Sequence, residues 1–257
     1  MKSVQTVSPI YLGFASQKGG VGKSTLAEVI SSILYYEKGI DLFVVDCDIT
    51  QDSFFKLRER ERRCISNDAV LAQQMQAYFE RIQRKAYPIL RAAPEDAITQ
   101  AEAFLEAKPA QLVIFDFPGH AGSAELFELS LKMNYILSPI EADVQSMVSC
   151  LSYAKTVVDL GISMASEPIH DIMLVWNKVD RRVRNTLMEH YSRYITEEGL
   201  TLMEASVYAA HRFSHELEQY GIRGVFRSTY LAPVKSLRVG TGIDELVDEL
   251  LQRIKLQ

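Results

Sequence analysis

The sequence has 257 residues but only three cysteines, and their spacing is not that of a metal site. Cys47, Cys64 and Cys150 are odd in number and far apart, and no Cys-x-x-Cys pair occurs. This argues against a disulfide framework, a structural zinc site and a cluster-binding subunit. The five histidines also lack metal-ligand spacing. We therefore expect a cytoplasmic protein in a reducing environment.

Long hydrophobic runs are missing as well. The apolar runs, such as 42–45 and 112–115, are far shorter than the about 18 to 20 residues that span a bilayer. The first residues are polar where a signal peptide would need an apolar core. Residues 243–255 carry an apolar stripe, but their polar face is acidic and anionic lipid would repel it. We expect no export and no membrane contact, and we expect this stripe to pack in the core.

Apolar runs of strand length alternate with stretches of helical periodicity, which is typical of parallel βαβ units. We expect an α/β fold with a mostly parallel sheet and helices on both faces. No repeat, low-complexity segment or linker divides the chain, so we expect one domain over residues 1–257. The first helix should begin near Lys23 and end before Gly39, and the last should cover 243–255. The expected strands are Ile10–Ala15, Leu42–Asp46, Tyr87–Arg91, Leu112–Asp116, Tyr135–Ile140, Ile172–Asn177 and Thr201–Val207.

Charge is unevenly distributed along the chain. Residues 56–93 contain nine basic and four acidic residues, a local net charge of +5, whereas the whole chain carries −5. Residues 221–240 contain no acidic residue at all. Either stretch could neutralise DNA phosphates without reading the base sequence. For residues 56–63 the alternative is a solvated helix face with internal ion pairs to Glu59 and Glu61. The basic residues of the acid-free stretch are Arg223, Arg227, Lys235 and Arg238.

The most informative segment is 17–25, with the sequence QKGGVGKST, between a strand-like run and a helical stretch. We interpret it as the phosphate-binding motif GxxxxGK[ST] in its strand-loop-helix context. Glycines let backbone N–H groups turn toward phosphate oxygens at a helix N-terminus, whose dipole favours an anion. Lys23 would reach the β and γ phosphates, and Ser24 would coordinate Mg²⁺. The alternative is a glycine turn that only joins strand to helix, but a lysine and two hydroxyls there have no packing purpose.

The same segment resembles the deviant Walker A motif of the ParA/MinD-type ATPases, in which an extra lysine, here Lys18, precedes the first glycine. Two further segments agree in order and spacing. Residues 44–48 (VVDCD) resemble the family's second-strand DxD, and 113–119 (VIFDFPG) resemble its Walker B strand with the DxPG switch. The resemblance covers the whole chain. It implies a P-loop NTPase fold, ATP and Mg²⁺ as cofactors, and an ATP-sandwiched homodimer in which Lys18 reaches the nucleotide of the other subunit.

Within this family the closest pattern is that of the ParA-like TraA proteins of conjugative transposons. One departure is that partition ATPases usually have Asp-Pro-Gln soon after the DxD, whereas Asp48 is followed here by Ile-Thr-Gln. The loop geometry there should differ from the family's, although the carboxylates are kept. The segments that carry the pattern are 14–20 (FASQKGG), 45–48 (VDCD), 85–88 (KAYP), 138–143 (SPIEAD) and 225–229 (VFRST).

The chemistry and the resemblance together suggest a role for each site residue. Hydrolysis needs charge neutralisation at the γ-phosphate and a positioned water. Two lysines and Mg²⁺ would supply the charge, and Asp48 would orient the water. Asp116 would hold the Mg²⁺ shell through water, and Asp46 would support it. The alternative for each aspartate is a helix cap or turn residue. The expected catalytic residues are Lys18, Lys23 and Asp48. The expected metal ligands are Ser24, Asp46 and Asp116. The other expected nucleotide contacts are Gly19, Gly20, Val21, Gly22, Thr25 and Gly119.

Residues 177–180 (NKVD) follow an expected strand and resemble the guanine-recognition motif NKxD of GTPases. In that motif the Asp carboxylate accepts two hydrogen bonds from guanine, a donor edge that adenine lacks. ParA/MinD-type ATPases also place an asparagine at the end of this strand, where it contacts adenine. The resemblance therefore assigns Asn177 to the base and favours ATP. Asp180 could equally pair with Arg181 or Arg182 in a solvated turn.

These features predict a slow, partner-stimulated ATP hydrolase that acts in conjugative transfer or partition of a mobile DNA element. Its expected partners are a second copy of the chain, an unidentified protein of the transfer or partition apparatus and, through the basic stretches, DNA. Three alternatives stay open. They are a GTPase-type switch, a nucleotide-dependent interaction protein with little turnover, and a P-loop ligase that resembles dethiobiotin synthetase and would need a small-molecule pocket.

Overall fold

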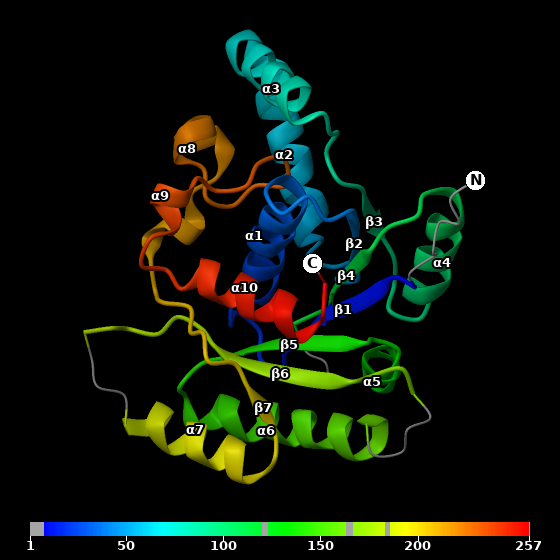
Figure 1. The fold of residues 1–257 in the computed structure, drawn as a ribbon, viewed down its shortest axis with the longest axis vertical. Coiled ribbons are helices and arrows are strands. Elements are labelled where there is room, and N and C mark those ends of the chain that lie inside the picture. Colours follow the sequence, from blue (N-terminus) through cyan, green and yellow to red (C-terminus); the bar gives the residue numbers. More distant parts are fainter. Residues whose placement is uncertain (1–7, 120–122, 163–166, 183–185, 257) are drawn as a thin grey trace.

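Seven strands form the central sheet of the computed structural model, in the order β3-β2-β4-β1-β5-β6-β7 (Figure 1). The structure describes residues 8–119, 123–162, 167–182 and 186–256. Each strand runs parallel to its neighbours. The first strand therefore lies between the fourth and the fifth, where the connections change sides, and the carboxyl ends of strands at such a point form a ligand crevice. The strands are β1 (Ile10–Phe14), β2 (Leu42–Asp46), β3 (Ile89–Arg91), β4 (Leu112–Asp116), β5 (Tyr135–Ile140), β6 (Asp171–Trp176) and β7 (Thr201–Leu202).

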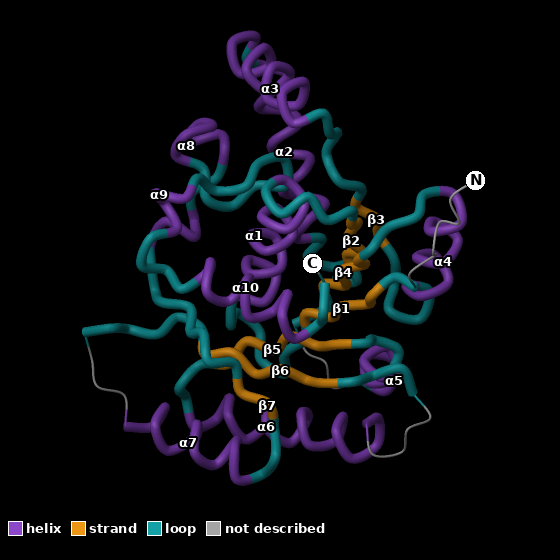
Figure 2. The backbone as a smooth tube through the Cα atoms, in the orientation of Figure 1, coloured by secondary structure: helices purple, strands orange, loops and turns teal. Residues whose placement is uncertain are grey.

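Helices connect these strands and close the chain (Figure 2). Between β2 and β3 two helices, α2 and α3, extend beyond the sheet at the top of Figure 1. The helices are α1 (Lys23–Tyr36), α2 (Ser53–Asn67), α3 (Ala69–Ile82), α4 (Ala97–Ala107), α5 (Ala124–Leu131), α6 (Val144–Val157), α7 (Thr186–Glu197), α8 (Leu217–Gly224), α9 (Lys235–Arg238) and α10 (Ile243–Arg253), with a π-helix η1 (Val158–Ile162) and a 3₁₀-helix η2 (His211–Ser214).

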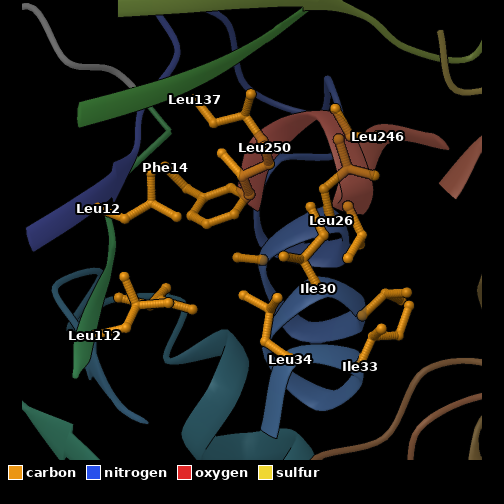
Figure 3. Packing of buried hydrophobic residues seen from close by; sticks show 14 of the residues in the cluster. Leu12, Phe14, Leu26, Ile30, Ile33, Leu34, Leu112, Leu137, Leu246 and Leu250 are labelled. Carbon is orange, nitrogen blue, oxygen red and sulfur yellow. The ribbon is translucent and has the colours of Figure 1, made fainter. Parts of the chain in front are cut away.

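The side chains of β4 show how the sheet is covered on both faces. Leu112 and Ile114 belong to a buried cluster with α1 and α10 (Figure 3), whereas Val113 and Phe115 belong to the cluster with α4, α5, α6 and α7. All four side chains are fully buried, which explains why this run is apolar throughout. The predicted α/β fold with helices on both faces of a parallel sheet is confirmed.

The predicted strand 201–207 is wrong beyond Leu202. The backbone N–H groups of Glu204 and Ala205 donate to the Glu249 carboxylate of α10, at 3.1 and 2.9 Å, and the chain returns to β6 only at Val207, whose N–H donates to Trp176 O at 2.8 Å. An edge strand can end this way because one of its sides has no neighbouring strand. The predicted strand 87–91 is also too long. It begins at Ile89 because Pro88 has no N–H to donate to the sheet.

The predicted ends of the first and last helices agree with the structure to within a few residues. Gly39 follows α1 with φ +75°, the left-handed conformation expected of a glycine at a helix end. The last helix, α10, ends at Arg253, and its apolar stripe is buried as predicted. Among the described residues no helix is both long and apolar enough to cross a bilayer.

Candidate nucleotide-binding site

The loop between β1 and α1 borders a cavity of about 350 Å³ at the carboxyl edge of the sheet. Gly20 and Gly22 turn the loop with φ +79° and +87°, conformations that residues with a Cβ rarely adopt. Val21 is 1% exposed, so its side chain packs beneath the loop and does not border the cavity. The predicted site residues on this cavity are Lys18, Gly19, Gly20, Gly22, Lys23, Ser24, Thr25, Asp48 and Gly119.

Residue 17 departs from the standard phosphate-binding motif that the sequence was expected to contain. The pattern GxxxxGK[ST] requires a glycine at position 17, and this chain has Gln17 there. The segment therefore matches the deviant form beginning at Lys18, and not the standard form. The loop nevertheless runs from strand to helix as the phosphate-binding geometry requires, and α1 begins at Lys23.

Lys23 lies at the floor of this cavity, in contact with two other predicted site residues. Its Nζ is 3.0 Å from Asp116 Oδ1 and 3.3 Å from Ser24 Oγ. Asp116 is fully buried, and its second oxygen, Oδ2, has no hydrogen-bond partner among the described residues. Burying a carboxylate oxygen without a hydrogen-bond partner costs free energy. Binding of a ligand that supplies such a partner would therefore be favourable.

Ser24 and Asp116 together offer the oxygen donors that Mg²⁺ prefers. Nowhere in the described part of the chain do three His, Cys, Asp or Glu residues form a cluster that could hold a metal. A magnesium ion bound here would therefore complete its shell with nucleotide oxygens and water, as Mg²⁺ commonly does. The residues present fit such an ion.

Asp46, at the end of β2, acts as a helix cap. Its Oδ2 accepts hydrogen bonds from the backbone N–H groups of Phe54 (3.1 Å) and Phe55 (3.3 Å) at the start of α2, and Oδ1 accepts from Asp48 N (3.3 Å). Burial, together with the nearby charge of Asp116, raises the pKa of Asp46 to about 7. Both oxygens of Asp46 therefore already accept hydrogen bonds, and the buried carboxylate of Asp116 lies nearby.

Asp48 faces the same cavity and is 4% exposed. Its Oδ1 accepts hydrogen bonds from Thr50 Oγ1 (2.6 Å) and from the backbone N–H of Gln51 (3.0 Å). This turn is made by the Ile-Thr-Gln sequence that departs from the family pattern. The hydroxyl of Thr50 thus fixes the carboxylate of Asp48 in the phosphate cavity.

The family's extra lysine, Lys18, binds an acidic residue of its own chain. Its Nζ is 2.5 Å from Asp143 Oδ2, just after β5, and its side chain is 40% exposed. The hydrogen bond to Asp143 raises the pKa of Lys18. Lys18 is therefore fully charged at the mouth of the phosphate cavity.

A second cavity, of about 620 Å³, adjoins the first on the side of β6. Asn177 lines it and is buried, and its Nδ2 donates to Val21 O at 2.6 Å. Lys178 donates to Gly20 O and pairs with Glu141 Oε1 at 2.8 Å. The same cavity has six further lining residues that no sequence motif indicated: Tyr208, Ala209, Ala210, His211, Phe213 and Ser214.

Asp180, the acidic residue of the NKxD pattern, does not line this cavity. Its carboxylate instead pairs with Arg182, with Oδ1 at 2.9 Å from Nε and Oδ2 at 2.8 Å from Nη2. These hydrogen bonds lower the pKa of Asp180 to about 2. In this arrangement Asp180 belongs to an exposed turn, the alternative considered for it from the sequence.

The acid-free stretch 221–240 exposes Arg223 and Lys235, whereas its other two cations pair with carboxylates of the same chain. Arg238 is 2% exposed and contacts Glu37 at 2.8 Å and Asp244 at 3.0 Å. Arg227 lies between Glu28 and Glu216. The stretch contains no acidic residue, but carboxylates on both sides of it (Glu216 and Asp244) and from in or beside α1 (Glu28 and Glu37) pair with its arginines.

The basic helix α2 is divided between the interior and the solvent. Arg58 donates to Thr229 Oγ1 at 2.7 Å, and Glu61, which is buried, accepts from Thr229 N at 2.9 Å. Arg62 pairs with Glu59 at 3.0 Å on the exposed side, as the solvated alternative predicted. The exposed cations of this helix are Lys56, Arg60, Arg62 and Arg63.

The parallel sheet, the glycine loop and the two adjoining cavities define a P-loop nucleotide-binding fold. Residues 12–218 match the CobQ/CobB/MinD/ParA nucleotide binding domain, and the chain belongs to this family. No curated protein matches the sequence significantly.

Solved structures of the family share the fold at low sequence identity. The MinD cell division protein of Aquifex aeolicus has a TM-score of 0.60 and 15% identity, over 96% of this chain and 97% of that one. The Pyrococcus furiosus cell division ATPase MinD has the same TM-score and identity, over 96% and 99%. A putative plasmid partition protein of Borrelia burgdorferi B31, bound to AMPPNP, has a TM-score of 0.60 and 12% identity, over 95% and 99%.

Proposed function

We propose that the protein is a Mg²⁺-dependent ATPase of ParA/MinD type whose dimerisation is switched by ATP. The observation that carries the proposal is the contact of Lys23 with Asp116 and Ser24 below the glycine loop, beside a second cavity large enough for a base. The Borrelia partition protein binds AMPPNP and a Pyrococcus horikoshii MinD binds Mg-ADP, which supports the same ligands here.

On phosphate binding, Lys23 would exchange its contact with Asp116 for contacts with phosphate oxygens. The ammonium group would leave Asp116 Oδ1 for the β and γ phosphates, and both Asp116 oxygens would then be available to the Mg²⁺ shell together with Ser24 Oγ. A bound Mg²⁺ would neutralise charge on the phosphates. Asp48 would orient the attacking water from the position that Thr50 fixes, and Asn177 would contact the adenine.

We further propose that Lys18 exchanges its contact with Asp143 for a contact with the nucleotide of a second copy of the chain. We also propose that the chain forms one domain. A MinC:MinD complex of Aquifex aeolicus shows a fold relative with a protein partner. By the resemblance to TraA proteins, the partner here would belong to a conjugative transfer or partition apparatus in the cytoplasm.

Lys23→Ala tests the phosphate site directly. Losing this charge should cost about 3 to 4 kcal/mol of transition-state stabilisation, which is at least a hundredfold in turnover. Mass by light scattering and phosphate release should be measured with ATP, ADP and GTP. Wild-type turnover in the variant would refute the site. In the wild-type protein, preference for GTP would favour the GTPase-type switch, and dimerisation without turnover would favour the nucleotide-dependent interaction protein.

DNA binding is proposed only for the exposed cations of α2. If Arg62 and Arg63 contact phosphates, changing both to Glu should weaken DNA binding and lower the salt slope by about 0.9 per lost contact. Arg81→Glu is a control in which one charge is reversed on α3, the helix that follows α2. Wild-type protein with ATP that shows no DNA association at about 50 mM salt would exclude DNA as a partner.

A further inference from the structure

One charged residue from outside the glycine loop lines both cavities. We call the cavity at the glycine loop the phosphate cavity and the adjoining cavity, which Asn177 lines, the base cavity. Among the described residues the two share Gly22, Thr25 and Arg227. Gly22 and Thr25 belong to the loop and to the first turn of α1, whereas Arg227 is some 200 residues further along the chain. A nucleotide with its phosphates in one cavity and its base in the other must pass its ribose and α-phosphate between them, beside this guanidinium.

The Arg227 guanidinium is held by two carboxylates but keeps an uncommitted donor. Its Nη2 donates to Glu216 Oε1. Its Nε lies 3.3 Å from Glu28 Oε2, yet neither of these two buried atoms has a hydrogen-bond partner in the part of the chain that the structure describes. Glu28 is 2% exposed and borders the phosphate cavity one turn after Ser24. The contact between Glu28 and Arg227 is therefore electrostatic only, and a better acceptor could replace it.

The backbone that carries Arg227 is fixed to α1, the helix that follows the glycine loop. Ser32 Oγ donates to Ser228 O, and Tyr36 OH donates to Thr229 O at 2.8 Å. Glu28, Ser32 and Tyr36 are spaced by four residues, so they form one polar stripe along α1. A cation supported in this way is preorganised relative to the phosphate loop, which is what a specific contact requires.

We propose that Arg227 binds the α-phosphate of the nucleotide, exchanging its contact with Glu28 for a phosphate oxygen. The inference rests on the proposed ATP site and deepens it. The guanidinium has the fork geometry that suits phosphate, and it retains Glu216 as a support while Nε turns to the ligand. Before the nucleotide arrives, Glu28 faces Nε at 3.3 Å, so it competes with the phosphate for this cation.

The test compares Arg227→Gln with Arg223→Gln, an exposed arginine of the same acid-free stretch. Dissociation constants for ATP, ADP, AMP and adenosine should be measured by fluorescence titration. Arg227→Gln should weaken ATP, ADP and AMP by a similar factor of roughly 10 to 100, the loss of one hydrogen bond to a charged group, and leave adenosine unchanged. Arg223→Gln should behave like the wild type. Unchanged affinity, or a loss confined to ATP, would overturn the α-phosphate assignment.

Glu28→Gln provides a second measurement with the opposite sign. It removes the competing carboxylate, so AMP and ADP should bind more tightly than to the wild type. Weaker binding in both Glu28→Gln and Arg227→Gln, together with a lower unfolding midpoint, would assign the pair a structural role and refute the proposal. If Lys23→Ala binds ATP as the wild type does, the proposed ATP site itself fails; if only the Arg227 and Glu28 results fail, the site stands without this contact.

Discussion

Gly22 is the position where the structure makes its sharpest prediction about the loop. With φ +87° it is in the left-handed region, and a Cβ built on it would lie 2.5 Å from Asn177 Nδ2. That amide donates to Val21 O at 2.6 Å and fixes the end of β6 against the loop. Gly20 offers a matched control, because it has φ +79° but a Cβ there meets nothing within 4 Å.

The two glycines should therefore differ in the cost of substitution by alanine. The left-handed backbone costs about 1 to 2 kcal/mol at either position. At Gly22 the methyl group must also displace Asn177, and a buried hydrogen bond broken on one side costs about 1 to 3 kcal/mol more. We expect Gly20→Ala to lower the free energy of unfolding by about 1 to 2 kcal/mol and Gly22→Ala by about 2 to 5 kcal/mol.

Urea unfolding of the nucleotide-free protein measures this difference, and Asn177→Ala provides the decisive background. If the clash with Asn177 causes the additional cost, Gly22→Ala should cost only the backbone strain of about 1 to 2 kcal/mol once the amide is gone. An equal cost of Gly22→Ala in both backgrounds, or a cost equal to that of Gly20→Ala in the wild type, would refute the reasoning.

Three further predictions concern acidic and basic side chains. Asp48→Ala should bind ATP and accumulate as a dimer without phosphate release; loss of ATP binding would instead assign Asp48 to the Mg²⁺ shell. The pKa of Asp46 is raised from 3.8 to about 7, so its ionisation destabilises the folded state increasingly as the pH rises between these values. The free energy of unfolding of the wild type should therefore fall relative to that of Asp46→Asn from pH 4 to pH 7. A difference that does not depend on pH would contradict this. Arg238→Glu should cost at least about 3 to 5 kcal/mol in urea unfolding, because it buries a carboxylate beside Glu37 and Asp244; Lys235→Glu, on the surface, should stay within about 0.5 kcal/mol.

The strands near the centre of the sheet were predictable because each is covered on both faces and is apolar throughout. The runs 42–46 and 112–116 were predicted as buried strands, and the strands in the structure have the same bounds. The edge strand at 201–202 could not be predicted as well, because a side chain from α10, Glu249, replaces its sheet partner. Contacts of that kind depend on where a helix docks, and local sequence does not contain this information.

The phosphate loop was predictable from a short motif, whereas the base cavity was not. The lining residues 208–211, 213 and 214 of the base cavity match no binding motif, and only the folded chain brings them into one cavity with Asn177. The role of Asp46 was also beyond the sequence. A carboxylate after a strand suits either a metal shell or a helix cap, and only the positions of Phe54 N and Phe55 N show that it caps α2.

The acid-free stretch shows why a local charge count is a poor guide to a binding surface. Arg227 and Arg238 are neutralised by carboxylates from α1, α10 and the turns beside them, some of them about 200 residues away. A partial signal was nevertheless present in α1, where Glu28, Ser32 and Tyr36 recur at a spacing of four among buried apolar residues. A buried helix bears such a polar stripe only if a polar segment crosses it, because unpaired polar groups in a core are costly. The stripe thus requires a partner segment, and charge count then supplies the candidate: a stretch rich in arginine with no acid of its own. A DNA surface, if the chain has one, should therefore be sought among exposed cations that no such stripe accounts for, such as Arg62 and Arg63 on the outer side of α2.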